Sequence, residues 1–294
     1  MRIGFVPHPR KRAALALMEQ MISHLEAEVG ETPIEYVISD EIKKSQRVVG
    51  RTYCGISEMK ADVMICLGGD GTLLHALRKG DGPVLGVNVG SLGFLMEVRP
   101  EDAKRALDLV LSGEYTIEER TKLQTAVNGE RLPDAANEVV VMTSVPSKIQ
   151  SFEVYVDMKR VQKIRSDGII ISTPTGSTSY AMSAGGVIMD PRLKALQIVP
   201  VSPFKLSVRP LVIPEESTVA LRIMDKRRGA VLVVDGNYRR NVRYRDDIIL
   251  TRSKERGRFV RFELDFYKRY QEKLVRDCGA PEVSGPADGP NRSE

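Results

Sequence analysis

The stretch with the clearest chemical potential is Leu67-Gly68-Gly69-Asp70-Gly71-Thr72-Leu73-Leu74. It directly follows an apolar run, 63–67, that predicts a buried strand, and it opens a segment with helical spacing. Glycines let a backbone approach a ligand closely, and the free N–H groups of a helix start favour phosphate. A carboxylate would repel phosphate there. Asp70 is therefore predicted either to accept a proton or help hold a metal, or only to cap a strand-to-helix turn.

This loop matches neither of the two common nucleotide-binding signatures. A P-loop requires GxxxxGK[ST], and no lysine follows here at that spacing. The later segment 86–93 fails the GxGxxG spacing of a dinucleotide fingerprint. We therefore predict a different kind of phosphate-donor loop, made of Gly68, Gly69, Gly71 and Thr72.

Two further polar stretches could bind a ligand. Asn137-Glu138 stands just before an apolar strand, so its amide and carboxylate could point at one ligand or could simply be surface polar residues. Residues 165–186 run from a buried strand into a hydroxyl-rich loop with seven Ser or Thr between 172 and 183. Such a loop suits a sugar or an adenine, although a Ser/Thr-rich turn is the alternative. Asp167, just before that strand, could accept from a hydroxyl or an amide.

The chain predicts two domains of different character. Residues 1–115 alternate short apolar strands with helical patterns, which predicts an α/β domain with a mainly parallel sheet. Its strands are expected over 2–6, 34–38, 63–67 and 84–87, and its helices over 11–27, from 72, and over 102–111. Residues 116–264 alternate with period two, which predicts a β-rich domain. A helix over 265–276 and a disordered tail over 279–294 are expected to follow.

Composition narrows the class of protein. The net charge is +5, but the basic residues are dispersed, only 5% of residues are aromatic and there is no Trp. This argues against nucleic-acid binding and suits a polyanionic small substrate. No apolar run reaches the roughly 18 residues of a membrane span and the N-terminus does not read as a signal peptide, so we expect a cytoplasmic protein that does not bind membranes. The three cysteines form no CxxC pair, so no zinc site or disulfide framework is suggested.

Together these stretches closely resemble the NAD kinase family, from the GGDGT loop to Asp235-Gly236-Asn237. GGDGT alone is shared with lipid kinases, but its combination with 88–94, Asn137-Glu138 and the SDG…STPTGSTSY block is specific. The resemblance implies the same two domains, with 265–278 returning to the first. It also implies Mg²⁺ or another divalent cation, bound with the phosphate donor ATP or polyphosphate. A homodimer or homotetramer is expected.

The resemblance further implies roles for individual residues. Asp70 corresponds to the family's catalytic base, and no protein metal ligand is assigned. NAD is expected to contact Gly71, His75, Asn137, Glu138, Lys148, Arg165, Asp167, Thr178, Ser179, Tyr180, Ser183 and Asn237. For His75 and Lys148 an ordinary surface role is the alternative. Phe204 stands where many bacterial members have His, so that contact is absent or replaced by Lys205, and the pattern resembles the archaeal branch.

The implied reaction is transfer of a phosphoryl group to the 2′-hydroxyl of the adenosine ribose of NAD, which gives NADP. Two other functions remain at this point: a GGDGT-type kinase of lipids or other small molecules, and a non-catalytic NADP-binding sensor. The intact Asp70 argues against the sensor, and the lack of an obvious membrane-facing apolar segment argues against the lipid kinase.

Overall fold

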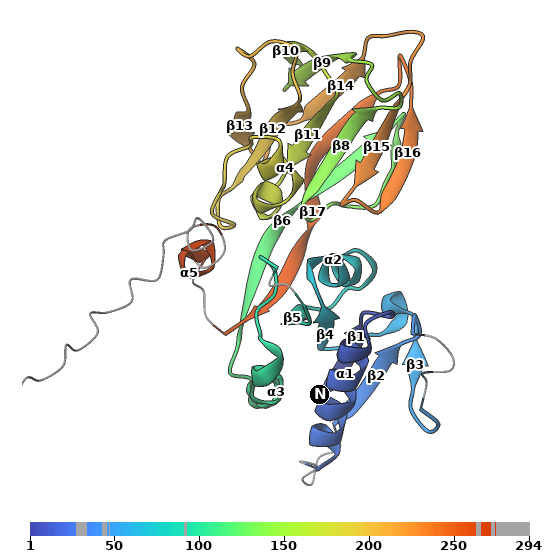
Figure 1. Ribbon diagram of the computed structural model, residues 1–294, viewed down its shortest axis with the longest axis vertical. Coiled ribbons are helices and arrows are strands. Elements are labelled where there is room, and N and C mark those ends of the chain that lie inside the picture. The colour runs from blue at the N-terminus through green and yellow to red at the C-terminus, as the bar shows by residue number, and fades with distance from the viewer. Residues whose placement is uncertain are drawn as a thin grey trace, which may run out of the picture. The chain divides into compact units, whose positions relative to one another are not determined.

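The structure, a computed structural model, describes residues 1–27, 34–42, 46, 48–90, 93–262, 266–271 and 274. The chain divides into two compact units, Met1–Phe262 and Glu263–Glu294. All strands of the described residues belong to the first unit, which Figure 1 shows as a lower α/β part and an upper β-rich part. Among the described residues, no helix is both long enough and apolar enough to cross a membrane.

The lower part is a parallel sheet in the order β5-β4-β1-β2-β3 with helices on both faces. Its strands are β1 (Arg2–Pro7), β2 (Glu35–Ser39), β3 (Tyr53–Cys54), β4 (Val63–Gly68) and β5 (Val84–Asn88). Its helices are α1 (Arg12–Ala27), α2 (Asp70–Lys79) and α3 (Ala103–Ser112), with single turns η2 (Ile56–Glu58) and η3 (Pro100–Asp102). Successive residues of β4 point to opposite faces: Ile65 packs with α1 and α3, and Cys66 packs with α2. This two-sided burial is why these strands are nearly continuous apolar runs.

A long ribbon of two strands connects the lower part to the upper part. It consists of β6 (Thr116–Val127) and β17 (Ile248–Arg261), which pair antiparallel. Near its end β17 pairs with β5 at Phe259 and Val84, so one sheet continues through both parts in the order β10-β9-β14-β17-β5-β4-β1-β2-β3. The remaining strands of this sheet are β7 (Glu130–Arg131), β9 (Gln150–Val156), β10 (Lys159–Ser166) and β14 (Val219–Ile223).

A second, antiparallel sheet packs on the upper part of the first. It is made of β13 (Leu211–Pro214), β12 (Ala195–Val201), β11 (Gly168–Ser172), β8 (Glu138–Thr143), β15 (Ala230–Val234) and β16 (Tyr238–Val242), in that order. The inner faces of the two sheets share one apolar core that includes Val139, Phe152 and Leu232. On the outer face, Ala181 covers Ile170 from the short segment formed by η4 (Thr175–Thr178) and α4 (Tyr180–Ser183).

The predicted fold class is confirmed: a mainly parallel α/β part is joined to a β-rich part. Helix α2 begins at Asp70, two residues before the expected start near 72. Strand β17 runs from Ile248 to Arg261 through a bulge between Arg252 and Arg256, which interrupts the period-two alternation in the sequence. Of the helix expected over 265–276, α5 (Phe266–Tyr270) is described. Its predicted return to the first domain and the predicted tail lie outside the described residues.

Candidate active site

The β4–α2 loop places several backbone N–H groups at the carboxyl edge of the parallel sheet. Gly69 is the N-cap residue of α2 in an extended conformation, and Asp70 is the first helical residue. A Cβ added at Gly69 or at Gly71 would meet no protein atom within 4 Å, so both residues face open space. At Gly68 an added Cβ would lie 2.4 Å from Thr72 Oγ1, which shows why glycine is needed there. The loop thus presents a bare backbone and a helix N-terminus, the combination that favours phosphate.

Asp70 is held by a second loop, the one that follows β5. Its Oδ2 accepts from the backbone N–H of Phe94 at 2.9 Å, and its Oδ1 accepts from the N–H of Leu95 at 3.1 Å. This approach requires a glycine, because a Cβ at Gly93 would lie 1.9 Å from Asp70 Oδ1. The carboxylate is therefore fixed in direction at the start of α2, half-buried, with lone pairs remaining for a ligand.

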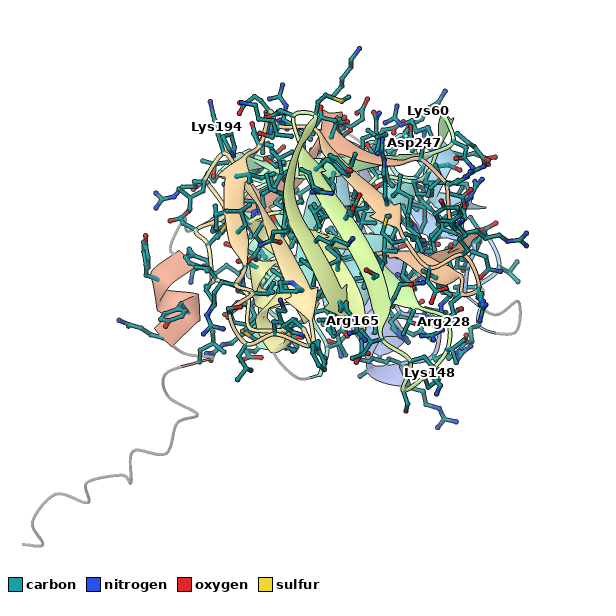
Figure 2. All side chains as sticks on the ribbon, turned by 90° about the horizontal axis from the view of Figure 1, so that it is seen from above. Lys60, Lys148, Arg165, Lys194, Arg228 and Asp247 are labelled. Carbon is teal, nitrogen blue, oxygen red and sulfur yellow. The ribbon has the colours of Figure 1, made fainter. Side chains whose placement is uncertain are left out.

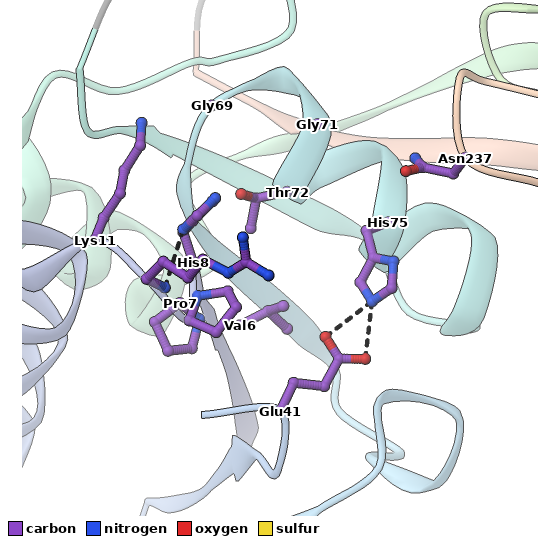
Figure 3. Close-up of a pocket in the computed structure, with 12 residues that line it drawn as sticks. Val6, Pro7, His8, Lys11, Glu41, Gly69, Gly71, Thr72, His75 and Asn237 are labelled. Carbon is purple, nitrogen blue, oxygen red and sulfur yellow. Dashed lines mark hydrogen bonds and ion pairs between the residues drawn. The ribbon is translucent and has the colours of Figure 1, made fainter. Parts of the chain in front are cut away.

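A crevice of about 700 Å³ opens in front of this loop (Figure 3). One wall comes from the loop after β1, with His8, Arg10 and Lys11, and another from Gly69, Gly71, Thr72 and His75 of the β4–α2 segment. Asn237 reaches it from the β-rich part and Glu41 from the segment after β2. The volume lies within the range of small-molecule sites, and the wall beside the helix start is basic, which suits a phosphorylated ligand.

His75 is fixed within an ion-pair network at the floor of this crevice. Its Nε2 lies 2.8 Å from both carboxylate oxygens of Glu41, and its Nδ1 lies 3.1 Å from Arg78 Nη2. Because Arg78 can only donate, Nδ1 accepts and Nε2 carries the proton. Burial works to raise the pKa of Glu41, but hydrogen bonds from Lys79 and His75 outweigh it and hold that pKa below its ordinary value. His75 therefore reaches the crevice as an oriented side chain.

A second polar cluster is buried at the start of β8. Asn137 and Glu138 are 7% and 5% exposed, and Asp235 accepts from their backbone N–H groups at 2.9 and 3.1 Å and from Ala136 N–H at 2.8 Å. Glu138 Oε1 accepts from the Ser179 hydroxyl at 3.2 Å. Within the described part of the chain, Asn137 Oδ1 and Glu138 Oε2 are buried without a hydrogen-bond partner. These two atoms are available to a ligand, which rules out the alternative of ordinary surface residues.

Burial, together with the nearby carboxylate of Asp235, raises the pKa of Glu138 to about 8, although the hydrogen bond from Ser179 works in the other direction. Burial also raises the pKa of Asp235, but three backbone N–H groups stabilise its charged form. The shared proton of this pair therefore resides on Glu138. In the absence of ligand, Glu138 can donate one hydrogen bond at neutral pH as well as accept.

The turn after β15 links this buried cluster to the crevice. Asp235 anchors the start of β8 through the three N–H bonds, and Asn237, two residues later, lines the crevice beside the β4–α2 segment. Ala136, which precedes the buried pair, packs in the same apolar cluster as Leu73 and Leu95. The predicted residues Asp70, His75, Asn137, Glu138 and Asn237 therefore form one region of the structure.

The hydroxyl-rich segment lies beside the same cluster. Thr173 Oγ1 donates to the carbonyl of Ala136 at 2.6 Å, and an added Cβ at Gly176 would lie 2.3 Å from the carbonyl oxygen of Asn137. Ser179 is bonded to Glu138, whereas Tyr180 and Ser183 are exposed on α4, and Thr178 is half-buried at the end of η4. The segment thus packs directly on the Asn137-Glu138 strand start and presents its polar side chains next to it.

The predicted residues that line the crevice are Gly69, Gly71, Thr72, His75 and Asn237. Asp70, Asn137 and Glu138 are not among its lining residues, and neither are Lys148, Arg165 and Asp167. Figure 2 shows Lys148 and Arg165 at the surface of the β-rich part. The guanidinium of Arg165 lies 5.0 Å from the ring centroid of Phe204, whose N–H donates to the Arg165 carbonyl at 2.8 Å. Phe204 therefore lies against a basic residue, while Lys205 is exposed.

Sequence reasoning missed His8, Arg10, Lys11 and Glu41, all of which line the crevice. A signal for three of them was present. The first strand was predicted to end just before them, and residues that follow neighbouring parallel strands meet at the carboxyl edge of the sheet. No comparable signal existed for Glu41, which reaches His75 only through the tertiary fold.

Two family models match the chain. The ATP-NAD kinase N-terminal domain matches residues 3–115, and the ATP-NAD kinase C-terminal domain matches residues 136–262. Among curated proteins, the NAD kinase of Methanothermobacter thermautotrophicus is 41% identical over 288 residues, covering 97% of this chain and 100% of the relative. The NAD kinase of Thermococcus gammatolerans is 39% identical over 280 residues, covering 94% and 99%. These matches agree with the resemblance found in the sequence.

Two solved structures share the fold. Yeast NADH kinase complexed with NADH superposes with a TM-score of 0.86 at 22% identity, covering 97% of this chain and 90% of that one. An NAD kinase from Archaeoglobus fulgidus in complex with ATP superposes with a TM-score of 0.74 at 25% identity, covering 95% and 100%. The arrangement of the two parts is thus that of NAD(H) kinases.

Proposed function

Because the chain belongs to the ATP-NAD kinase family, we propose that the crevice and the buried cluster beside it form its active site. The activity is that of an NAD kinase, which transfers a phosphoryl group from ATP to NAD and gives NADP. The observation that carries this assignment is the carboxylate of Asp70, which is fixed by two backbone N–H groups at the start of α2, between the crevice-lining residues Gly69 and Gly71 in the chain.

We place NAD against Asn137 and Glu138. Their buried atoms Oδ1 and Oε2 require partners, and the hydroxyl groups of a ribose both donate and accept. Ser179, Thr178 and Tyr180 lie next to them on the hydroxyl-rich segment. Asp70 then orients the 2′-hydroxyl and accepts its proton as the oxygen attacks the terminal phosphorus. The proton moves to the carboxylate and the bond to the leaving ADP breaks.

We place the phosphates of the donor in the crevice. The N–H groups at the start of α2 and the basic side chains of Arg10 and Lys11 surround that volume. The A. fulgidus relative was solved with ATP, which supports ATP as donor. The lining is mostly small or basic residues, with no aromatic side chain other than imidazole to stack on adenine. This motivates recognition through phosphates, so polyphosphate is expected to support some turnover as well.

A divalent cation, Mg²⁺ being the expected one, would accompany the donor. Within the described residues, no three His, Cys, Asp or Glu side chains come together as a metal cage. That fits Mg²⁺, which usually keeps several waters and binds through one or two carboxylates plus substrate phosphates. When bound, the cation neutralises charge on the transferring phosphate.

The activity is tested by incubating the protein with NAD, ATP and Mg²⁺ and measuring NADP with an NADP-specific dehydrogenase. NADP formation is expected, and its loss in the Asp70→Asn variant would link it to this site. NADP binding without turnover would instead identify a sensor, and phosphorylation of a lipid but not of NAD would identify the lipid-kinase alternative. Replacing ATP with polyphosphate tests the donor, and a strict requirement for ATP would contradict phosphate-only recognition.

We also propose a homodimer or homotetramer and a cytoplasmic location, both implied by the family and the sequence. Exposed apolar side chains in the β-rich part, Phe204 at 62% and Leu206 at 83%, support self-association. Light scattering of the purified protein tests it, and a monomeric mass at micromolar concentration would contradict it.

A further inference from the structure

A second crevice, of about 670 Å³, lies at the other end of α2. It forms where the C-terminal end of this helix, β6, the turn after β7 and the bulge of β17 come together. The bulge frees residues 253–255 from the ladder with β6. The hydroxyl of Ser253, in this bulge, donates to the buried lining residue Asp134, so the bulge is tied to the turn after β7.

The lining of this crevice is rich in cations. Its six basic residues are Arg78, Lys122, Arg131, Lys254, Arg256 and Arg258, against four acidic ones, Asp81, Glu119, Asp134 and Glu255. Arg131 pairs with Asp134 at 3.1 Å and Arg256 pairs with Glu215, which lies outside the crevice, at 3.1 Å. Asp81, Glu119 and Glu255 are exposed to solvent. The wall therefore carries more positive charge than its own carboxylates neutralise.

Four of these cations form no salt bridge among the described residues: Arg78, Lys122, Lys254 and Arg258. The charge of Arg78 does help to stabilise the buried carboxylate of Asp235. Two of them donate only to backbone carbonyls at the end of α2, Lys122 to Leu77 at 3.4 Å and Arg258 to Asp81. Cations that outnumber the carboxylates of a concave site attract phosphate groups, whose several oxygens can accept hydrogen bonds from several cations at once.

Arg78 links this crevice to the active site. It lines the second crevice, and its Nη2 donates to His75 Nδ1 at 3.1 Å. His75 in turn lines the first crevice and is bonded to Glu41. An anion in the second crevice would compete for the Arg78 guanidinium and weaken the hydrogen bond that orients His75. One side chain therefore senses both sites.

We propose that this second crevice is an effector site for a small phosphate-type anion, coupled through Arg78 to His75 in the active site. The proposal does not rest on the kinase activity, because binding and the response of His75 can be measured without turnover. It concerns a site separate from the donor crevice, since the two share no lining residue.

Pyrophosphate in magnesium-free buffer is the probe, followed by calorimetry and by the imidazole NMR signals of the chain's three histidines. His8 lines only the donor crevice, His75 senses both crevices, and His24, bonded to Asp108 between α1 and α3, is an internal reference. We expect two binding events in the wild type. The double variant Lys254→Gln, Arg258→Gln should weaken the affinity of one of the two binding events at least tenfold. It should also abolish that component of the His75 chemical-shift change whose midpoint differs from the midpoint of the His8 change.

The matched control is Lys104→Gln with Arg105→Gln, which removes the same charge from the exposed side of α3 and should leave both events unchanged. Arg10→Gln should show the converse pattern, with a weakened His8 response and a retained His75 component. The proposal is overturned if the Lys254 and Arg258 pair binds pyrophosphate like the wild type. It is equally overturned if His75 follows His8 with the same midpoint in every variant.

Discussion

Gly93→Ala is the most direct test of the role of Asp70, because it moves the carboxylate without changing it. The added Cβ would lie 1.9 Å from Asp70 Oδ1 and 2.4 Å from its Cγ. Carbon and oxygen normally approach no closer than about 3.3 Å, so the two groups must separate by roughly 1.4 Å. Both backbone hydrogen bonds to the carboxylate, at 2.9 and 3.1 Å, are then lost or lengthened.

The carboxylate, rather than the loop, is expected to yield. The loop is held on its far side, where the Leu95 carbonyl accepts from the buried guanidinium of Arg261 at 3.2 Å and Glu97 N–H donates to the Gly86 carbonyl at 2.9 Å. A catalytic group displaced by about 1 Å can lose about 10²-fold in rate. We therefore expect kcat for NADP formation to fall at least about 100-fold.

Steady-state kinetics with varied NAD and ATP measures this effect, and circular dichroism checks that the variant is folded. Gly55→Ala is the matched control, since its Cβ would meet Ser57 Oγ at an ordinary 3.8 Å, and it should keep wild-type kinetics. A folded Gly93→Ala variant with kcat within about threefold of the wild type would refute the reasoning, because a displaced base could not work that well.

Three further predictions concern the acidic residues. Asp70→Asn should lower kcat by about 10²–10⁴-fold while NAD binding changes only a few-fold; it should also lower the melting temperature, because the amide can accept only one of the two backbone N–H groups. Glu138→Ala should raise the KM for NAD by one or two orders of magnitude, since a buried polar group left without its hydrogen-bond partner costs roughly 1–3 kcal/mol, and an unchanged KM would remove Glu138 from the site. Because burial raises the pKa of Glu138 from 4.5 to about 8, the folded chain keeps a proton between these values that the unfolded chain has released, so the free energy of unfolding should fall as pH rises through this window. Glu138→Gln should flatten this dependence in denaturant titrations at several pH values, and an unchanged slope would contradict the protonation of Glu138.

The sequence could predict those parts of the site that are contiguous. The spacing of Gly69, Asp70 and Gly71 predicts a loop that opens a helix and can approach a ligand, because glycine conformation and helix-start chemistry are local properties. The alternation of strands and helices likewise predicts a parallel sheet. A period-two alternation of buried and less buried residues is present in β14 and β15, which have no bulge.

Features that depend on contacts between distant segments could not be predicted. Glycine is needed at position 93 because the carboxylate of Asp70 lies against it, and this contact between distant segments cannot be derived from the residues around Gly93. Glu41 meets His75 only because β2 and β4 both flank β1 in the sheet. The continuity of β17 was hidden by its bulge, since residues 253–255 break the alternation on which a strand prediction relies.

The acidic residues of this region differ in how many of their hydrogen-bonding positions the protein itself occupies. The oxygens of Asp235 accept from three backbone N–H groups and those of Asp70 accept from two, so both carboxylates also position a loop. Asn137 Oδ1 and Glu138 Oε2 are buried polar atoms without a partner among the described residues. Leaving a buried polar group unpaired costs about 1–3 kcal/mol each, a cost that folding alone does not offset. A substrate that supplies those two hydrogen bonds recovers this free energy on binding, which is why we place the ribose of NAD there.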